Sequence, residues 1–212
     1  MFRAYSKWTR GEQGITGLET AIILIAFVVV ASVFAYTVLS AGIFSSQKSS
    51  EAVYAGLAEA QSTLELDGSV LAIEDGVTNN IAYIAFTVKV ALKGEPIDFT
   101  IPTDAGANGI ADSGSSNVVV ISYVDPNQRV DDLYWEITKL GDADSDNILE
   151  TGEKFLIYVG DNDATGDLTD ALSTTNLTVD TTFTLEVKPP VGATLVIERT
   201  TPSNIDAINN LN

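Results

Sequence analysis

The sequence predicts an α+β protein in which a long hydrophobic N-terminal α-helix precedes an antiparallel, immunoglobulin-like β-sandwich. Three observations predict this class. Residues 20–47 contain no Asp, Glu, Lys or Arg and consist mainly of Ala, Val, Ile, Leu and Phe. No proline interrupts residues 16–66, so one helix can continue beyond the apolar run. Short segments rich in β-branched and aromatic residues, separated by Gly, Pro, Asn and Asp, fill the rest of the chain.

The apolar run is long enough to cross a bilayer as a helix, which takes about 20 residues. Its few polar residues, Ser32, Thr37 and Ser40, are small and can bond to carbonyls of their own helix. After Phe44 the composition becomes more polar, but apolar residues still recur at spacings of four, three and four, which predicts one helical face. These residues are Val53, Leu57, Ala60 and Leu64.

A helix ending near Leu66 would be about 75 Å long, far more than a bilayer requires. A single membrane anchor has no use for its second half, whereas a bundle of parallel helices does. Small side chains along the first half would allow such helices to approach closely. They are Ala31, Ser32, Ala35, Ser40, Ala41 and Gly42.

The first fourteen residues are basic and contain Arg3, Lys7 and Arg10. They adjoin the apolar segment directly, with Gly14 at the junction. The residues themselves leave two interpretations open. One is an uncleaved anchor with its basic residues on the cytoplasmic side. The other is a leader that is removed before Ile15, so that the helix stays in the mature chain.

Thr16 and Glu19 have the spacing of a capping box, and Glu19 also suits the positive end of the helix dipole. An unpaired carboxylate beside an apolar run is nevertheless costly. If the chain were cut after Gly14, the new amine of Ile15 would lie one helical turn from Glu19. We therefore expect Glu19 to pair with that amine in its own copy or a neighbouring one.

Beyond Asp67-Gly68 the sequence predicts seven or eight strands without intervening helices, which favours an antiparallel sandwich. Residues 189–192, Pro-Pro-Val-Gly, are expected to join the last two strands as a hairpin, and residues 161–178 are expected to form a polar loop. The expected strands are Val70–Ile73, Ile81–Leu92, Ile97–Ile101, Asn117–Val124, Leu133–Lys139, Phe155–Val159, Thr182–Lys188 and Ala193–Arg199.

The charge is concentrated in this second part. The chain has a net charge of −18, of which residues 68–212 contribute −16 through 7 basic and 23 acidic side chains. So acidic a surface argues against nucleic acid as a partner. With no Cys and no His, disulfides, thiol chemistry and the commonest general base are absent. We find no catalytic constellation, and Asp131-Asp132 is interpreted as a turn rather than a carboxylate pair.

Residues 142–153 have the spacing of a calcium-binding loop. Asp142, Asp144 and Asp146 occupy positions one, three and five. Ile148 supplies a backbone carbonyl at position seven, and Glu153 stands at position twelve, where a bidentate carboxylate belongs. An acidic solvated loop is the alternative. Because five carboxylates in twelve residues repel one another without a cation, we expect structural calcium.

One N-glycosylation sequon, Asn176-Leu177-Thr178, lies in the expected polar loop. Asn176 is therefore the candidate glycosylation site.

From about Arg10 to Leu66, the chain resembles archaellins, the archaeal flagellins related to type IV pilins. The resemblance rests on RGEQG-ITGLETAIILIAFVVVASVFAYTVLSAGIFSSQKS, in which the basic leader, Gly14, Ile15, Glu19 and the apolar run occur in register. It implies three segments: a leader over 1–14 that is cleaved after Gly14, a filament-core helix over 15–66 and an outer β-sandwich over 67–212.

The resemblance further implies a structural subunit of a rotating swimming filament that polymerises with itself and with related archaellins. Its expected partners are a prepilin-peptidase-like processing enzyme, the archaellum membrane assembly motor and, before assembly, the membrane. The expected location is an extracellular filament with a membrane-inserted precursor. Archaellins also often carry acidic loops and N-glycans. The alternatives are an adhesive type IV-like pilus subunit and a single-pass, calcium-binding surface protein.

Overall fold

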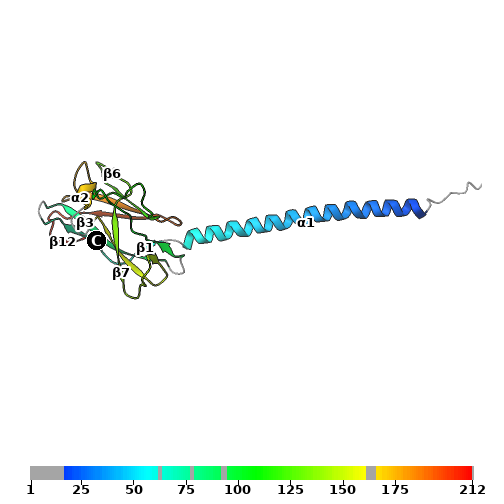
Figure 1. The fold of residues 1–212 in the computed structure, drawn as a ribbon, viewed down its shortest axis with the longest axis horizontal. Coiled ribbons are helices and arrows are strands. Elements are labelled where there is room, and N and C mark those ends of the chain that lie inside the picture. The colour runs from blue at the N-terminus through cyan, green and yellow to red at the C-terminus, as the bar shows by residue number, and fades with distance from the viewer. Residues whose placement is uncertain (1–16, 62–63, 77–78, 92–94, 161–165, 212) are drawn as a thin grey trace, which may run out of the picture. The chain divides into compact units, whose positions relative to one another are not determined.

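The computed structural model describes residues 17–61, 64–76, 79–91, 95–160 and 166–211, and for residues 58–61 it describes the backbone alone. The chain divides into two compact units, Met1–Val53 and Tyr54–Asn212. Most of the helix α1 (Gly17–Gln61) makes up the first unit, and the strands form the second, here called the β domain (Figure 1). The predicted α+β class is confirmed.

The helix α1 is one uninterrupted element of 45 residues, about 68 Å long at 1.5 Å per residue. Its run of Ile and Val has only moderate helix propensity in water. A helix does, however, satisfy every backbone group within one segment, which an apolar environment requires. Such surroundings therefore favour the helical form of this sequence.

The predicted helix end at Leu66 is wrong. The helix stops at Gln61, and β1 (Leu64–Leu66) pairs antiparallel with the end of β3, with Leu64 opposite Val90. Leu64 is buried in the core of the β domain, and Leu66 packs against that core. The Leu-Glu-Leu pattern suits a helix face or an alternating strand, and burial against the sheet decides between them.

A six-stranded antiparallel sheet runs in the order β12-β2-β3-β9-β7, with β1 paired to β3 beside this path. A four-stranded sheet runs in the order β11-β10-β5-β6, and β4 and β8 form a separate two-stranded ladder. The strands are β2 (Val70–Glu74), β3 (Ile81–Val90), β4 (Ile97–Asp98), β5 (Val120–Val124), β6 (Arg129–Val130), β7 (Trp135–Leu140), β8 (Ile148–Leu149), β9 (Lys154–Val159), β10 (Thr182–Lys188), β11 (Leu195–Thr200) and β12 (Ile208–Leu211).

The inward faces of both sheets contribute to one hydrophobic core. Phe99 packs edge to face against Trp135, at 5.8 Å between ring centroids, and against Phe155, at 5.9 Å. Tyr123 and Phe183 stack in the same cluster, with centroids 5.9 Å apart. These buried rings supply much of the apolar area that holds the sandwich together.

Each of the eight predicted strand segments contains a strand, and the predicted hairpin at residues 189–192 joins the paired strands β10 and β11. The sequence reading missed β1, β6, β8 and β12 because each is only two to four residues long. It also missed a short helix, α2 (Leu168–Ala171), inside the expected loop. Asp167 caps this helix by accepting hydrogen bonds from the amides of Thr169 and Asp170.

Candidate assembly helix and acidic loop

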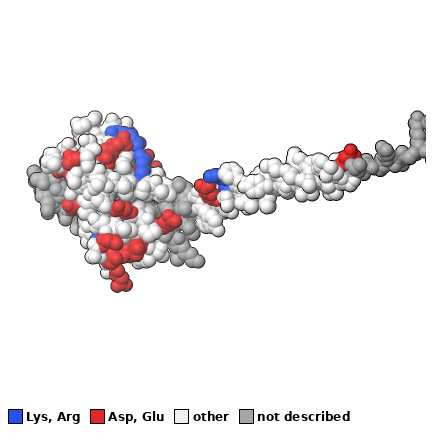
Figure 2. All heavy atoms as spheres, turned by 45° about the vertical axis from the view of Figure 1, so that its right-hand side comes forward, with Lys and Arg blue, Asp and Glu red and all other residues white. Residues whose placement is uncertain are grey.

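The surface of α1 is apolar around its whole circumference. From Ile22 to Val30 the residues are consecutively apolar, so they point in every direction about the helix axis. The large apolar side chains between Leu18 and Leu57 are 49% to 72% exposed. In Figure 2 the charged side chains on the described part of α1 stand only toward its two ends. This helix is long and apolar enough to cross a membrane.

The polar side chains in the run bond to their own helix. Ser32 Oγ donates to the carbonyls of Val28 at 2.8 Å and Val29 at 2.9 Å. Thr37 Oγ1 donates to the carbonyl of Phe34 at 2.8 Å. These hydroxyls therefore need no water, and α1 can enter lipid or protein without leaving them unpaired.

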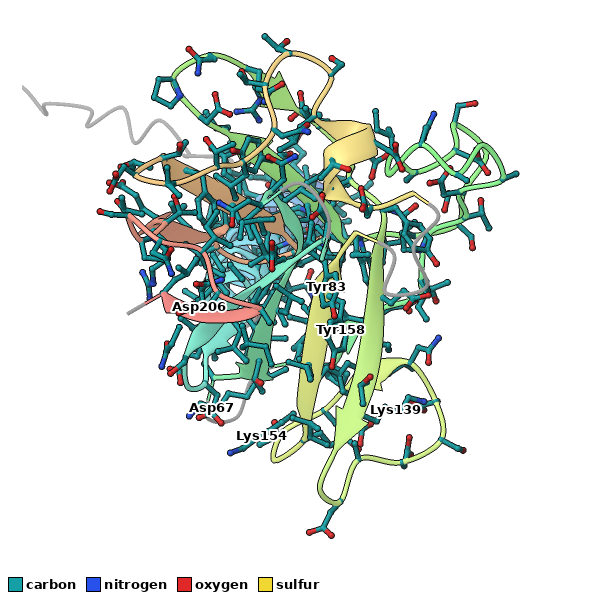
Figure 3. All side chains as sticks on the ribbon, turned by 90° about the vertical axis from the view of Figure 1, so that its left-hand side faces the viewer. Asp67, Tyr83, Lys139, Lys154, Tyr158 and Asp206 are labelled. Atoms are coloured by element: carbon teal, nitrogen blue, oxygen red, sulfur yellow. The ribbon has the colours of Figure 1, made fainter. Side chains whose placement is uncertain are left out.

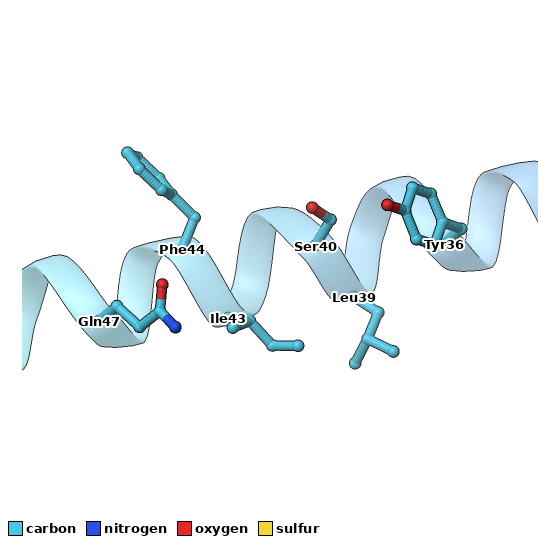
Figure 4. A pocket seen from close by; sticks show the side chains of 6 residues that line it. All are labelled: Tyr36, Leu39, Ser40, Ile43, Phe44 and Gln47. Carbon is cyan, nitrogen blue, oxygen red and sulfur yellow. The ribbon is translucent and has the colours of Figure 1, made fainter.

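A shallow groove of about 310 Å³ lies along one side of α1 between residues 36 and 47. Tyr36, Ser40 and Phe44 succeed one another at intervals of four, so the small Ser40 lies between two aromatic rings (Figure 4). Leu39, Ile43 and Gln47 complete the lining. A small residue flanked by large ones is the kind of hole into which a side chain of another helix packs.

The predicted cleavage residues Gly14 and Ile15 lie outside the described residues, as does Thr16 of the predicted capping box. Glu19 stands in the first turn of α1, where its charge suits the positive end of the helix dipole. Its predicted pairing with the amine of Ile15 therefore stays a prediction.

The acidic loop, residues 141–153, connects the end of β7 to the start of β9. Its carboxylates accept hydrogen bonds from backbone amides of the loop itself. Glu153 accepts from the amides of Asp144 at 2.9 Å and Glu150 at 3.0 Å. Asp144 accepts from the amide of Asp146, and Asp146 accepts from that of Ile148. Ile148 belongs to β8, where it lies opposite Asp98 of β4.

The carboxylates of the acidic loop do not gather as the ligands of a metal ion would. Among the described residues, no group of three or more Asp, Glu, His or Cys side chains gathers in a way that can hold a metal ion. The loop carboxylates, Asp142 included, therefore do not converge in this conformation. Calcium binding through Asp142, Asp144, Asp146, Ile148 and Glu153 stays a prediction and requires these side chains to rearrange.

The sequon residue Asn176 lies in the irregular segment between α2 and β10 and is half-buried. Both neighbours of Asn176 are held to the domain: Gln128 donates from Nε2 to the Thr175 carbonyl, and the carbonyl of the buried Leu177 accepts from the Ile81 amide at 3.0 Å. The predicted polar loop is thus an ordered surface segment at this point.

Sequence reasoning did not foresee a cluster of charges beside β1. Asp67 lies 2.6 Å from Lys154 Nζ of β9 and 3.2 Å from Lys89 Nζ of β3 (Figure 3 labels Asp67 and Lys154). Hydrogen bonds, first from Lys154 and then from Lys89, hold the pKa of Asp67 below its ordinary value. These ion pairs fasten the end of β1 to two strands of the larger sheet.

A second network lies on the four-stranded sheet. Glu186 is 2.8 Å from Lys188 and 3.1 Å from Arg129, and Arg129 is also 2.8 Å from Asp131. Lys188 and then Arg129 lower the pKa of Glu186. All six Lys and Arg side chains described between residues 68 and 212 contact acceptors in this same chain, so much of the remaining surface is acidic.

Asp131-Asp132 lies in the bend that follows β6, as the interpretation of these residues as a change of chain direction expects. Asp132 adopts a positive φ of 57°, and Asp131 is paired with Arg129. The Asp131 carboxylate belongs to the ion-pair network, and the Asp132 carboxylate accepts a hydrogen bond from Asn117 Nδ2 at 3.3 Å.

The comparison with protein families decides the identity. A family model described as archaeal-type flagellin matches residues 14–199. The chain belongs to the archaeal-type flagellin family.

This flagellin is 36% identical over 216 residues to Probable flagellin 1 of Archaeoglobus fulgidus, covering 95% of this chain and 96% of that protein. It is 34% identical to Probable flagellin 2 of the same organism, covering 92% and 93%. Among solved structures it resembles the archaeal flagellum of Methanospirillum hungatei strain JF1, with 27% identity and a TM-score of 0.63. That likeness covers 93% of this chain and 99% of the other.

This flagellin is accordingly a structural subunit of the extracellular archaellum filament and not an enzyme. It polymerises into that filament with flagellin paralogues. The exposed apolar surface of α1 and the acidic surface of the β domain are therefore properties of a filament building block.

Proposed function

We propose that α1 is the assembly element of this flagellin, which lies first in the membrane and then passes into a bundle of identical helices at the filament centre. The observation that carries this proposal is the exposure of nearly uniform apolar surface along α1, at 49% to 72% for each large side chain. Burying one such side chain stabilises by about 1.5–3 kcal/mol. Leaving them all in water would cost on the order of tens of kcal/mol, more than the ~5–15 kcal/mol that stabilises a typical domain.

The transfer from lipid to helix bundle exchanges one apolar environment for another, so hydrophobic burial does not drive it. Close packing must supply the preference. The small residues of the helix and the groove over Ser40 support this step, because they admit side chains of a neighbouring helix. The self-bonded hydroxyls of Ser32 and Thr37 support it as well, because they need no partner in either environment.

We propose further that a prepilin-peptidase-like enzyme removes residues 1–14 by cutting after Gly14, and that the archaellum membrane motor assembles and turns the filament. Ile15 then begins the mature chain, and its amine neutralises Glu19. The pairing would lower the charge that α1 carries from the membrane into the filament.

N-terminal sequencing of the native protein tests this proposal. A mature chain that begins at Ile15 is expected. A chain that begins at Met1 or Phe2 and stays in the membrane as single molecules would contradict it, because the helix would then be a permanent anchor.

Calcium binding by residues 142–153 is a separate proposal. It is supported by the spacing of five ligand positions within one loop and by the mutual repulsion of the carboxylates. We expect calorimetry of the intact protein to detect calcium binding, and calcium to raise the melting temperature of the β domain.

The variant Asp142→Asn serves as the matched test, because the loop hydrogen bonds described above use the carboxylates of Asp144, Asp146 and Glu153 and not that of Asp142. The variant is expected to weaken calcium binding while preserving the metal-free fold. Absence of both heat and a melting shift in the unmodified chain would reject the site.

We also propose N-glycosylation at Asn176. A mass of the intact native protein equal to that of the polypeptide alone would exclude it.

A further inference from the structure

The outer face of the six-stranded sheet carries a contiguous apolar and aromatic surface. Its members point away from the core, and none of them belongs to the core cluster or packs against it. We call this surface the Tyr83–Tyr158 face. It consists of Leu71 and Ile73 of β2, Tyr83 of β3, Leu156 and Tyr158 of β9, and Ile208 of β12.

Strand register places these side chains next to one another. Ile208 lies opposite Ile73, which lies opposite Tyr83. Tyr83 and Tyr158 meet edge to face, with ring centroids 5.9 Å apart and planes at 63° (Figure 3). Ile208, Ile73 and Tyr83 thus form one cross-strand row, and the ring contact of Tyr83 with Tyr158 joins this row to the next one.

The next cross-strand row contains Leu71, Ala85 and Tyr158. Ala85 lies between Leu71 and Tyr158 on this face and is only 2% exposed. The larger neighbours therefore shield Ala85. At the margin Ile208 remains 65% exposed, an unusual amount for an isoleucine in a strand.

The charges near the Tyr83–Tyr158 face lie at its margins, where Asp67 is paired with Lys89 and Lys154 next to Leu156. The cross-strand rows through Tyr83, Tyr158 and Leu156 contain one charged side chain, Glu136 of β7, which accepts a hydrogen bond from the Tyr134 hydroxyl at 3.1 Å. By contrast, the outer face of the four-stranded sheet carries the ion-pair network around Glu186.

Charge decides which surface a second copy can approach. Residues 68–212 carry a net charge of −16, so β domains brought together in a polymer repel one another wherever carboxylates face carboxylates. An apolar surface with few carboxylates reduces this repulsion and gains from being removed from water. The repulsion also weighs against an acidic partner and leaves a neutral surface of the sister subunit as the matching side.

We propose that the Tyr83–Tyr158 face is a lateral contact between the β domains of neighbouring flagellin subunits. The contact is heterologous, because a helical filament joins two different patches of the same chain. This inference rests on polymerisation of the family, which belongs to the established function, and not on the cleavage at Gly14.

The absence of cysteine from the chain makes the contact directly testable, because a single introduced thiol reports on one position. The test variant is Ile208→Cys at the margin of the face. The matched control is Val196→Cys on the outer face of the four-stranded sheet, since Val196 is 58% exposed against 65% for Ile208. Maleimide labelling rates are measured in intact filaments and in subunits dissociated from the same filaments with detergent.

In filaments the Ile208→Cys thiol is expected to react roughly tenfold or more slowly than in dissociated subunits, because a packed interface excludes water and reagent. The Val196→Cys thiol is expected to react at similar rates in both states. Equal protection at the two sites, protection at residue 196 alone, or slow labelling of residue 208 already in dissociated subunits would overturn the proposal.

A charge variant gives a second, independent measurement. Filaments of Ile208→Glu are expected to dissociate at a lower temperature than filaments of Val196→Glu, although both variants add one negative charge at an exposed aliphatic position. Indistinguishable dissociation temperatures would overturn the proposal. Every measurement starts from filaments that have already formed. A negative result would therefore contradict the lateral contact but not the assembly through α1.

Discussion

The helix α1 and the β domain use the same kinds of side chain for opposite purposes. Phe27 of α1 is 71% exposed, whereas Phe86 of β3 is completely buried. The β domain therefore stabilises itself, while α1 leaves its apolar surface for other molecules to cover. The comparison shows that hydrophobic composition alone does not say where a core lies, because the covering partner can belong to another chain.

The largest effect is expected from a charge placed in α1. Val30 and Val196 are both 58% exposed, so Val30→Asp and Val196→Asp differ mainly in the environment that the assembled protein provides. An aspartate in the middle of an apolar helix costs about 2.5–3.5 kcal/mol on membrane insertion. We expect Val30→Asp to abolish filaments and Val196→Asp to retain them, as judged by electron microscopy and sedimentation. Normal filaments from Val30→Asp would remove the distinction between the two regions.

A cavity in the β domain should produce the next largest effect. Phe86→Ala is expected to lower the unfolding free energy of that domain by about 3–5 kcal/mol, because it leaves a void in the core. Phe27→Ala removes the same ring from α1 and is expected to leave the melting temperature of the β domain unchanged. Circular dichroism of the detergent-solubilised chains measures both variants. A matching loss in Phe27→Ala would mean that the β domain depends on α1 for its stability.

The pH dependence of the ion pairs at the end of β1 sharpens the comparison on the side of the β domain. Lys154 and Lys89 depress the pKa of Asp67, whose ordinary value is 3.8. The stabilisation from Asp67 is therefore present above pH 3.8 and is lost as the pH falls through the lower pKa of the folded state. Asp67→Asn should lower the urea midpoint at pH 7 and converge with the unmodified chain in strong acid.

The charge partner provides the control for this prediction. Lys154→Met removes the other end of the 2.6 Å pair and should show the same convergence at low pH. If the difference in urea midpoint between the unmodified chain and either variant is the same at pH 7 and at pH 3, the effect comes from packing and not from charge.

The smallest effect is expected at a position that is buried but polar. Among the described residues, Trp135 Nε1 is the one buried side-chain polar atom without a hydrogen-bond partner. Trp135→Phe removes this unsatisfied donor, which costs about 1–3 kcal/mol, but it also loses apolar contact area. We expect the two contributions to nearly cancel, within about 1 kcal/mol, as measured by urea unfolding. A loss as large as that of Phe86→Ala would mean that the indole nitrogen has a partner.

Several local features were predictable from the sequence because they depend on neighbours along the chain. The apolar run of α1, the alternation in β3 and β10, and the turn at residues 189–192 each follow from adjacent residues. The spacing in the acidic loop was equally visible. Whether its carboxylates converge was not, because hydrogen bonds from loop amides hold them in the present conformation.

The sequence by itself determined the class of the protein and its division into an apolar helix and an acidic β domain, since composition and periodicity act over short distances. Only the tertiary structure decided that Leu64 belongs to a strand, that Asp67 meets Lys89 and Lys154, and that the Tyr83–Tyr158 face comes together from four strands. Such contacts join residues far apart in the chain, and their free energy exists only once the sheets have formed.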